Sequence, residues 1–187
     1  MKRELSEMSL EELWELFPII LSEHEDCWNV WYREEENRIT DFLSIKDIRI
    51  SHIGSTAINR LWAKPIIDIL LEIPAAYSMD HVKQLLVNNG YLCMSEGERR
   101  KSFNRGYTND GFAERVFHLH LRYLGDNDEL YFREYMNEHT EIAKEYEELK
   151  RSLGRKYEHN REAYTDGKTD FIKKHTECAK REYGSRY

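Results

Sequence analysis

Hydrophobic residues along the chain change their spacing twice, which divides the chain into a helical start, a central segment with strands and a helical end. The first part carries an apolar stripe from Leu10 to Phe17 at helical spacing. Ser9 and Glu12 stand at the spacing of a capping box, in which each side chain accepts a hydrogen bond from the other residue's backbone N–H. We therefore expect a short helix that starts at Ser9, followed by a longer amphipathic helix over residues 19–43.

The central segment shows the alternation and the apolar runs that are typical of strands. Ile48 and Ile50 alternate with polar residues before a turn at Gly54, and the apolar, β-branched run over 64–73 is interrupted near its middle by the carboxylate of Asp68. These patterns predict a strand that enters a turn and then a buried strand. The rest of the segment predicts a helix over 80–89, strands over 91–94 and 116–123, and a strand or loop edge over 96–109.

Helical spacing returns at residue 127 and continues almost to the end of the chain. Thr140 is the expected N-cap of a second helix in this part, and a last helix is expected over 161–180. The expected fold class is therefore α+β, with a mixed β-sheet flanked by helices and a helical C-terminal extension. We expect one domain over residues 1–187, with N-terminal helices in 1–45, an α/β core in 46–125 and C-terminal helices in 126–187.

Composition and charge exclude several classes of protein. The 187 residues are 40% hydrophobic and 12% aromatic, which is enough to build a core and excludes a disordered chain. The formal net charge is −7, which argues against general nucleic-acid binding, because phosphate backbones are bound by clustered Lys and Arg. The chain shows no leader pattern, no apolar run long enough to span a membrane and no disulfide or zinc spacing, so we expect a cytoplasmic protein that is not in a membrane.

Candidate phosphate-binding residues follow the first expected strand. A glycine at position 54 lets the backbone approach a phosphate closely, and Ser55 and Thr56 would start a short helix whose free N–H groups face an anion. Lys64 would add positive charge to the same corner. A Gly-Ser pair after a strand is also common in ordinary turns, so these residues alone do not distinguish the two interpretations.

Asp68 is the candidate metal ligand. It is the single ionisable side chain in the first part of an apolar strand, and an unpaired charge is costly to bury. A divalent cation would offset that cost, and so would an ion pair with Lys64 or Arg60. The combination of a strand, Gly-Ser and a strand Asp favours a site that binds a phosphate and a metal.

The stretch from His52 to Ile73 resembles the signature of the GrpB-like family, which is assigned to the nucleotidyltransferase superfamily. Similar blocks follow in order, namely Phe117–Leu121, Leu130–Tyr135, Ala143–Lys150 and Tyr164–Ile172. The resemblance implies a nucleotidyltransferase-type fold, in which Gly54 and Ser55 contact phosphates and Asp68 holds Mg²⁺ or Mn²⁺. It further implies ATP or another nucleoside triphosphate as substrate or ligand, and a lining role for Tyr164 and Lys168.

Two positions depart from that pattern. A typical active nucleotidyltransferase has a second carboxylate two residues after the first, and Leu70 stands at this position. Glu72 is four residues from Asp68, about 13 Å along a strand, which is too far to share a metal. The Pro-Gly that the family commonly has after Gly-Ser-Thr is replaced by Ile58-Asn59-Arg60.

His118 and His120 are the candidates to complete the site. Residues two apart on a strand project from one face, and the superfamily has a third carboxylate on such a later strand. The two histidines would act as metal ligand, phosphate donor or base, with Asp68 and His120 as the metal pair. Alternatively, both are ordinary hydrogen-bonded histidines.

Basic residues outside this centre are open to two interpretations. Arg105, in a stretch with three other cations, would bind a triphosphate tail or belong to a solvated loop. Arg133 and Lys150 lie among glutamates, so we expect them to be paired on the surface or at a contact between helices.

Three hypotheses about function follow. The first is a metal-dependent nucleotidyltransferase that moves a nucleotidyl group from a nucleoside triphosphate to a small acceptor. The second is a catalytically weak or inactive module that binds a nucleotide or another phosphorylated ligand, and Leu70 favours it. The third is a helical interaction protein with a vestigial pocket, which the presence of Lys64 and Asp68 disfavours.

Overall fold

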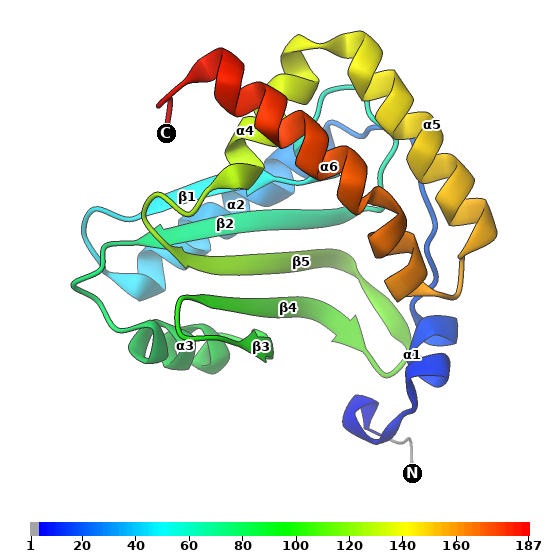
Figure 1. The fold of residues 1–187 in the computed structure, drawn as a ribbon. Helices are drawn as coiled ribbons and strands as arrows, with labels where there is room; N and C mark the ends of the chain where they lie inside the picture. The colour runs from blue at the N-terminus through cyan, green and yellow to red at the C-terminus, as the bar shows by residue number, and fades with distance from the viewer. Residues whose placement is uncertain (1–3) are drawn as a thin grey trace.

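The computed structural model describes residues 4–187 and contains helices on both sides of one sheet (Figure 1). The helical elements are η1 (Leu5–Glu7), α1 (Leu10–Leu16), α2 (Cys27–Leu43), η2 (Ser55–Ala57), α3 (Met79–Asn88), α4 (Asp128–Glu138), α5 (Thr140–Lys156) and α6 (Arg161–Tyr183). The strands are β1 (Arg49–Ile53), β2 (Ile66–Ile73), β3 (Leu92–Glu96), β4 (Arg100–Thr108) and β5 (Gly111–Tyr123). This arrangement confirms the expected α+β class.

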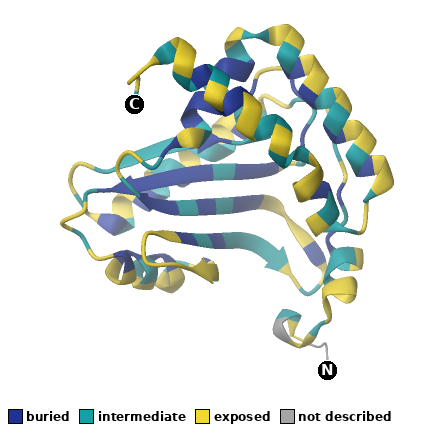
Figure 2. Ribbon diagram, in the orientation of Figure 1, coloured by how far each residue is buried: buried dark blue, intermediate teal, exposed yellow. Residues whose placement is uncertain are grey.

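The five strands form one mixed sheet in the order β1-β2-β5-β4-β3. β2 and β5 are parallel, and each other neighbouring pair is antiparallel. The parallel pair sits in the middle, and its paired residues, 66–73 and 116–123, are buried or half-buried, as Figure 2 shows. In this register Asp68 lies opposite His118 and Leu70 lies opposite His120, so the candidate residues share the centre of the sheet.

The two faces of the sheet pack against different helices. Ile67, Ile69 and Leu71 of β2 and Leu119 of β5 form the main core with α2 and α3. On the other face α4, α5 and α6 form a second core, and they are grouped together in Figure 1. Because side chains alternate along a strand, Asp68, Leu70 and the two histidines point to this second face.

The first helix begins as predicted. Ser9 caps α1 by accepting a hydrogen bond from the N–H of Glu12 at 3.2 Å, and the Glu12 carboxylate accepts one from the N–H of Ser9 at 2.8 Å. The prediction of a second helix from residue 19 is wrong, because α2 begins at Cys27. Residues 19–22 use their backbone elsewhere: Ile19 donates to the Glu158 carbonyl, and Ser22 pairs with Ala63 in an isolated bridge.

Later elements differ from the predictions mainly in their limits. The stretch 96–109, expected as a strand or loop edge, contains the nine-residue strand β4. β5 starts at Gly111, earlier than the predicted 116, because Thr108 and Gly111 pair in a tight hairpin with β4. Thr140 is the first residue of α5, and its N-cap is His139. Within residues 4–187, no helix combines the length and the apolar character that crossing a membrane requires.

Candidate functional site

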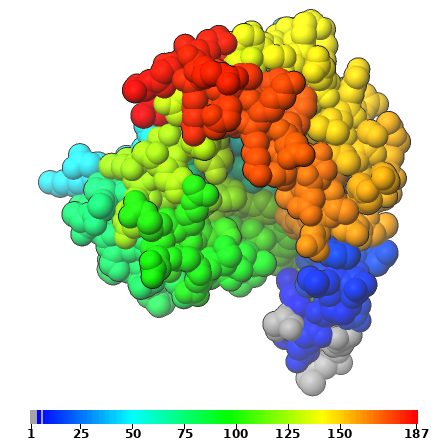
Figure 3. Space-filling view, viewed as in Figure 1, coloured from blue at the N-terminus to red at the C-terminus, as the bar shows by residue number. Residues whose placement is uncertain are grey.

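A pocket of about 610 Å³ lies between the sheet and the helices α4, α5 and α6. Figure 3 shows the surface hollowed beside α6, which is drawn in orange. β1, β2 and β5 provide one wall, and α6 provides much of the other. The predicted residues that line it are Gly54, Ser55, Lys64, Asp68, His118, His120, Tyr164 and Lys168.

Gly54 brings the backbone directly against Asp68. Its φ angle is +70° and its ψ is −169°, a combination that is nearly restricted to glycine. A Cβ added at this position would lie 2.2 Å from Oδ2 of Asp68. The glycine therefore allows the chain after β1 to turn beside the carboxylate, and it places Ser55 in the pocket wall.

Thr56, the third residue of this turn, has a structural role. It is buried, its hydroxyl donates to the Ile66 carbonyl at 3.2 Å, and the same oxygen lies 2.9 Å from Nε2 of His52. These contacts fix the turn to the start of β2. The structure thus places Thr56 behind the pocket and not among its lining residues, contrary to the expected phosphate contact.

Asp68, His118 and His120 converge at the floor of the pocket. Nδ1 of His118 lies 3.2 Å from Oδ1 of Asp68, and Nε2 of His120 lies 3.9 Å from the same oxygen. Nε2 of His118 lies 3.2 Å from a guanidinium nitrogen of Arg161, which can only donate. His118 is therefore held with its proton on Nδ1, which donates to Asp68, and with Nε2 as an acceptor.

The charge states of this centre follow from burial and from neighbouring charges. Burial alone would raise the pKa of Asp68, but hydrogen bonds and charge from His118 and His120 lower it well below its usual range. Burial lowers the pKa of His118, Asp68 opposes that shift, and Arg161 and Lys64 add to it. The centre thus combines an ionised carboxylate with a neutral imidazole at ordinary pH.

Leu70 occupies the position of the absent second carboxylate and is fully buried. It packs with Ile53 of β1 and Leu130 of α4, so this part of the wall is apolar. Glu72, further along β2, is also fully buried and forms an ion pair with Arg49 at 2.5 Å and a hydrogen bond with the N–H of Gly125 at 3.0 Å. Glu72 is therefore part of the fold and does not reach the pocket.

Lysines surround the ionised centre. The ammonium groups of Lys64 and Lys168 lie 5.4 and 4.6 Å from the centre of the Tyr164 ring, within the range of cation–π attraction. Burial, with the charges of Arg161 and Lys168, lowers the pKa of Lys64 to about 7. Burial also lowers the pKa of Lys168, against the attraction of Asp68. An anion bound in the pocket would make the charged form of each lysine more favourable.

Lys150 and Arg161 were not predicted as pocket residues. Lys150, expected in a surface or interhelical pair, is 1% exposed and donates to the Trp62 carbonyl, while its side chain also lines the pocket. Arg161 donates to the Tyr107 hydroxyl at 2.8 Å and contacts His118. A sequence signal exists for Arg161, because it lies seven residues before Lys168 and thus on the same face of one helix.

Arg105 lies away from the pocket. It pairs in β4 with Phe117, a residue that points to the α2 face, and its guanidinium forms an ion pair with Glu35 of α2. The Phe117 ring is 5.4 Å from that guanidinium. The expectation that Arg105 binds a triphosphate tail is therefore wrong, because alternation along β4 directs it to the opposite side of the sheet.

A metal would need ligands from outside the chain to be held here. Among residues 4–187, no group of three or more His, Cys, Asp or Glu side chains is arranged to bind a metal ion. Asp68 and His120 lie close enough to share one ion, and Mg²⁺ commonly binds through one or two carboxylates together with substrate phosphates. The residues fit one ion that arrives with a triphosphate, and they do not fit a centre of two ions.

Comparison with known proteins gives a consistent family and fold. A family model described as GrpB protein matches residues 18–178. UPF0157 protein YqkA of Bacillus subtilis is 34% identical over 161 residues, which are 84% of this chain but 46% of YqkA, so the chain spans about half the length of this relative. The crystal structure of conserved protein GrpB from Enterococcus faecalis superimposes with a TM-score of 0.76 at 28% identity, over 88% of this chain and 99% of that one.

A more distant similarity concerns the fold alone. The Cid1 poly(U) polymerase, in a structure described as MgGTP bound, matches with a TM-score of 0.50 at 11% identity, over 75% of this chain and 44% of Cid1. This match, together with the mixed sheet, confirms the expected nucleotidyltransferase-like fold.

Proposed function

The chain belongs to the GrpB family, and from that premise we propose that it binds a nucleoside triphosphate in the pocket and transfers a nucleotidyl group to a small acceptor. The observation that carries the proposal is the set of cations, Lys64, Lys168 and Arg161, around the ionised Asp68. Triphosphates need such fixed positive charge, since the reaction develops negative charge on phosphate oxygens. Cid1 supports the proposal as a protein of similar fold described with MgGTP.

The lysines and Arg161 would bind the phosphate oxygens. Lys64 and Lys168 project toward the pocket beside the Tyr164 ring, which limits the positions that they adopt. Ser55 adds a hydroxyl donor, and Gly54 keeps the approach to Asp68 open. In this arrangement the phosphates would lie near the floor formed by Asp68.

Asp68 and His118 would move the proton. Asp68 holds His118 with its proton on Nδ1, and Nε2 faces Arg161 and the Tyr107 hydroxyl. This nitrogen would take the proton from an acceptor hydroxyl that replaces the Tyr107 hydroxyl beside it. The acceptor oxygen would form a bond to the α-phosphorus, the bond to the oxygen that bridges to the β-phosphorus would break, and pyrophosphate would leave. A divalent ion, Mg²⁺ or Mn²⁺, held by Asp68 and His120 would supply further charge neutralisation at the phosphates.

A second candidate function is nucleotide or phosphate binding without turnover. Leu70 favours it, because a buried leucine stands where active nucleotidyltransferases have a carboxylate. The pocket cations are the same in both candidates, so the two differ in product formation and not in affinity.

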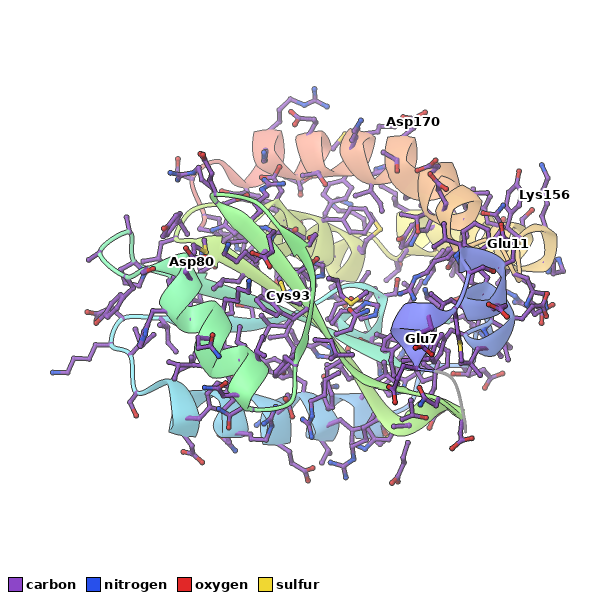
Figure 4. All side chains as sticks on the ribbon, turned by 90° about the horizontal axis from the view of Figure 1, so that it is seen from below. Glu7, Glu11, Asp80, Cys93, Lys156 and Asp170 are labelled. Carbon is purple, nitrogen blue, oxygen red and sulfur yellow. The ribbon has the colours of Figure 1, made fainter. Side chains whose placement is uncertain are left out.

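Calorimetric titration with ATP, GTP, CTP and UTP, with Mg²⁺, Mn²⁺ or EDTA, tests the binding. We expect at least one triphosphate to bind the wild type, and Asp68→Asn to lose the metal-dependent part of the affinity. Asp170→Asn is the matched control, because Asp170 is exposed on the outer side of α6 (Figure 4). Absence of binding by every triphosphate with every metal would refute nucleotidyl transfer, and the second candidate as far as it concerns nucleoside triphosphates.

Formation of a nucleotidylated product separates the two candidates. Wild-type protein is incubated with the triphosphate that it binds and with a fractionated small-molecule extract, and products are identified by mass spectrometry. Transfer predicts a nucleotidylated product that His118→Ala does not form. Binding without any such product supports the second candidate and contradicts transfer.

A further inference from the structure

A second cavity, of about 700 Å³, lies beside the pocket on the same face of the sheet. Its outer wall comes from η1 and α1, and the remaining walls come from β3, β4 and β5. Figure 4, seen from below, shows Cys93 of β3 near the middle of the view and Glu7 and Glu11 of these N-terminal helices to its right. Trp14 and Phe17 are the large aromatic residues of the outer wall.

The lining changes from apolar to polar along the cavity. Leu10, Leu92 and Met94 line it and are 60%, 52% and 59% exposed, although each is a large hydrophobic residue. Among its described lining residues there is no Asp, Glu or Lys, and the polar groups at its inner side include Tyr107, His118, His120 and Arg161. An apolar cavity with a few polar groups is the usual site for a small molecule with an apolar body and a polar head.

His118, His120 and Arg161 line both cavities, so the two spaces meet at the proposed base. The Tyr107 hydroxyl lies 2.8 Å from Nε2 of His118 and reaches it from the side of the second cavity. The Phe17 ring, 4.7 Å from the Tyr107 ring, packs against it. The Tyr107 hydroxyl thus marks a path from the apolar cavity to Nε2 of His118, and an acceptor hydroxyl that enters by this path would take the place of the Tyr107 hydroxyl.

We propose that the second cavity is the acceptor site, and that it binds a small molecule with an apolar, aromatic-sized body and directs its hydroxyl group to His118. This inference rests on the proposed nucleotidyl transfer. The cation-rich pocket would hold the triphosphate, and the apolar cavity would hold the group that receives the nucleotidyl unit. Both molecules must then be bound at the same time.

The neutral fluorescent probe N-phenyl-1-naphthylamine tests the acceptor site. We expect the wild type to bind it with increased fluorescence, and Met94→Glu to weaken binding about tenfold or more, because the substitution adds a carboxylate to an apolar wall. Val30→Glu is the matched control, since Val30 is 53% exposed on α2, against the opposite face of the sheet. ATP affinity should remain unchanged in both variants, which also shows that they fold.

Whether the probe and ATP bind at the same time decides whether the second cavity is a separate acceptor site. Simultaneous binding, with loss of probe affinity in Met94→Glu alone, supports the acceptor site. Displacement of the probe by ATP, equal effects of both variants or no probe binding would overturn it, and so would a dimer that Met94→Glu dissociates in light scattering. Failure of the wild type to bind any triphosphate would refute the proposed function instead, independently of the probe.

Discussion

Lys64 is a residue whose charge depends on the pocket around it. Its ammonium group is surrounded by Arg161 and Lys168, with Asp68 as the opposing negative charge. Burial and the two cations lower its pKa from 10.5 to about 7. The folded protein therefore releases a proton near neutral pH that the unfolded chain retains up to about pH 10.

This difference predicts two opposite pH dependences. Between pH 7 and 10 the unfolded chain binds more protons, so the free energy of unfolding of the ligand-free protein should rise with pH. Triphosphate binding needs the charged ammonium, so ATP affinity should fall over the same window, by up to about tenfold per pH unit, the limit for one linked proton. Urea unfolding and calorimetry from pH 7 to 9.5 measure the two effects.

Lys64→Gln is the variant that assigns this behaviour to one residue. It should bind ATP more weakly at pH 7 and keep only the shallower pH dependence to which Lys168 contributes. A wild-type affinity that stays constant from pH 7 to 9.5 would contradict the assignment of Lys64 as a phosphate ligand.

At the scale of single residues, the sequence identified the centre but not all of its surroundings. Asp68, His118 and His120 were predictable because alternation along two neighbouring strands places them on one face. Lys150 was not, because its burial depends on the Trp62 carbonyl, 88 positions away in the chain. The prediction of Arg105 as a phosphate ligand was wrong, because the basic composition of this stretch fits a loop as well as the nine-residue strand β4.

At the scale of elements, α6 is the helix that turns a sheet surface into a pocket. Arg161, Thr165, Lys168 and Ile172 follow one another at steps of three or four residues, so one helix face lines the pocket. Lys174 lies on the same helix and is exposed. The position of a lysine on α6, and not the total charge of the helix, should therefore govern ligand binding.

Lys168→Ala and Lys174→Ala remove the same charge from the same helix. We expect Lys168→Ala to weaken ATP binding roughly 10- to 100-fold, since a hydrogen bond to a charged group contributes about 1.5–3 kcal/mol. Lys174→Ala should leave the dissociation constant unchanged. Calorimetry measures both, with circular dichroism as the check on folding. Equal losses in the two variants would attribute binding to net charge and contradict the pocket.

Strands and helices differed in how well the sequence predicted them. β2 was predicted within two residues because a nearly continuous apolar run is typical of a strand that is buried on both faces. The start of α2 was wrong, because residues 19–26 have a composition that fits a helix, whereas the backbone of Ile19 and Ser22 pairs with distant segments. Pairing of this kind leaves no periodic signal in the local sequence.

At the scale of the whole molecule, the pocket lies where the sheet meets the C-terminal helices. Its walls come from the sheet and from α4, α5 and α6, whereas no residue of α3 lines it. A triphosphate bound between Asp68 on β2 and Lys168 on α6 would thus connect the sheet to the C-terminal helices. Ligand that binds only the folded state adds RT ln(1 + [L]/Kd) to stability, about 2.7 kcal/mol at one hundred times Kd.

Hydrogen–deuterium exchange tests where that stabilisation appears. With saturating ATP and Mg²⁺, amide exchange in α6 and β2 should slow, because opening of α6 away from the sheet would break the ligand contacts. Exchange in α3, which packs on the other face through Val82 and Leu86, should change much less. Lys168→Ala, measured at the same ATP concentration, should lose the protection of α6. Equal protection of α3 and α6 in the wild type would mean that the ligand stabilises the protein only globally, and would contradict a bridge between the sheet and the C-terminal helices.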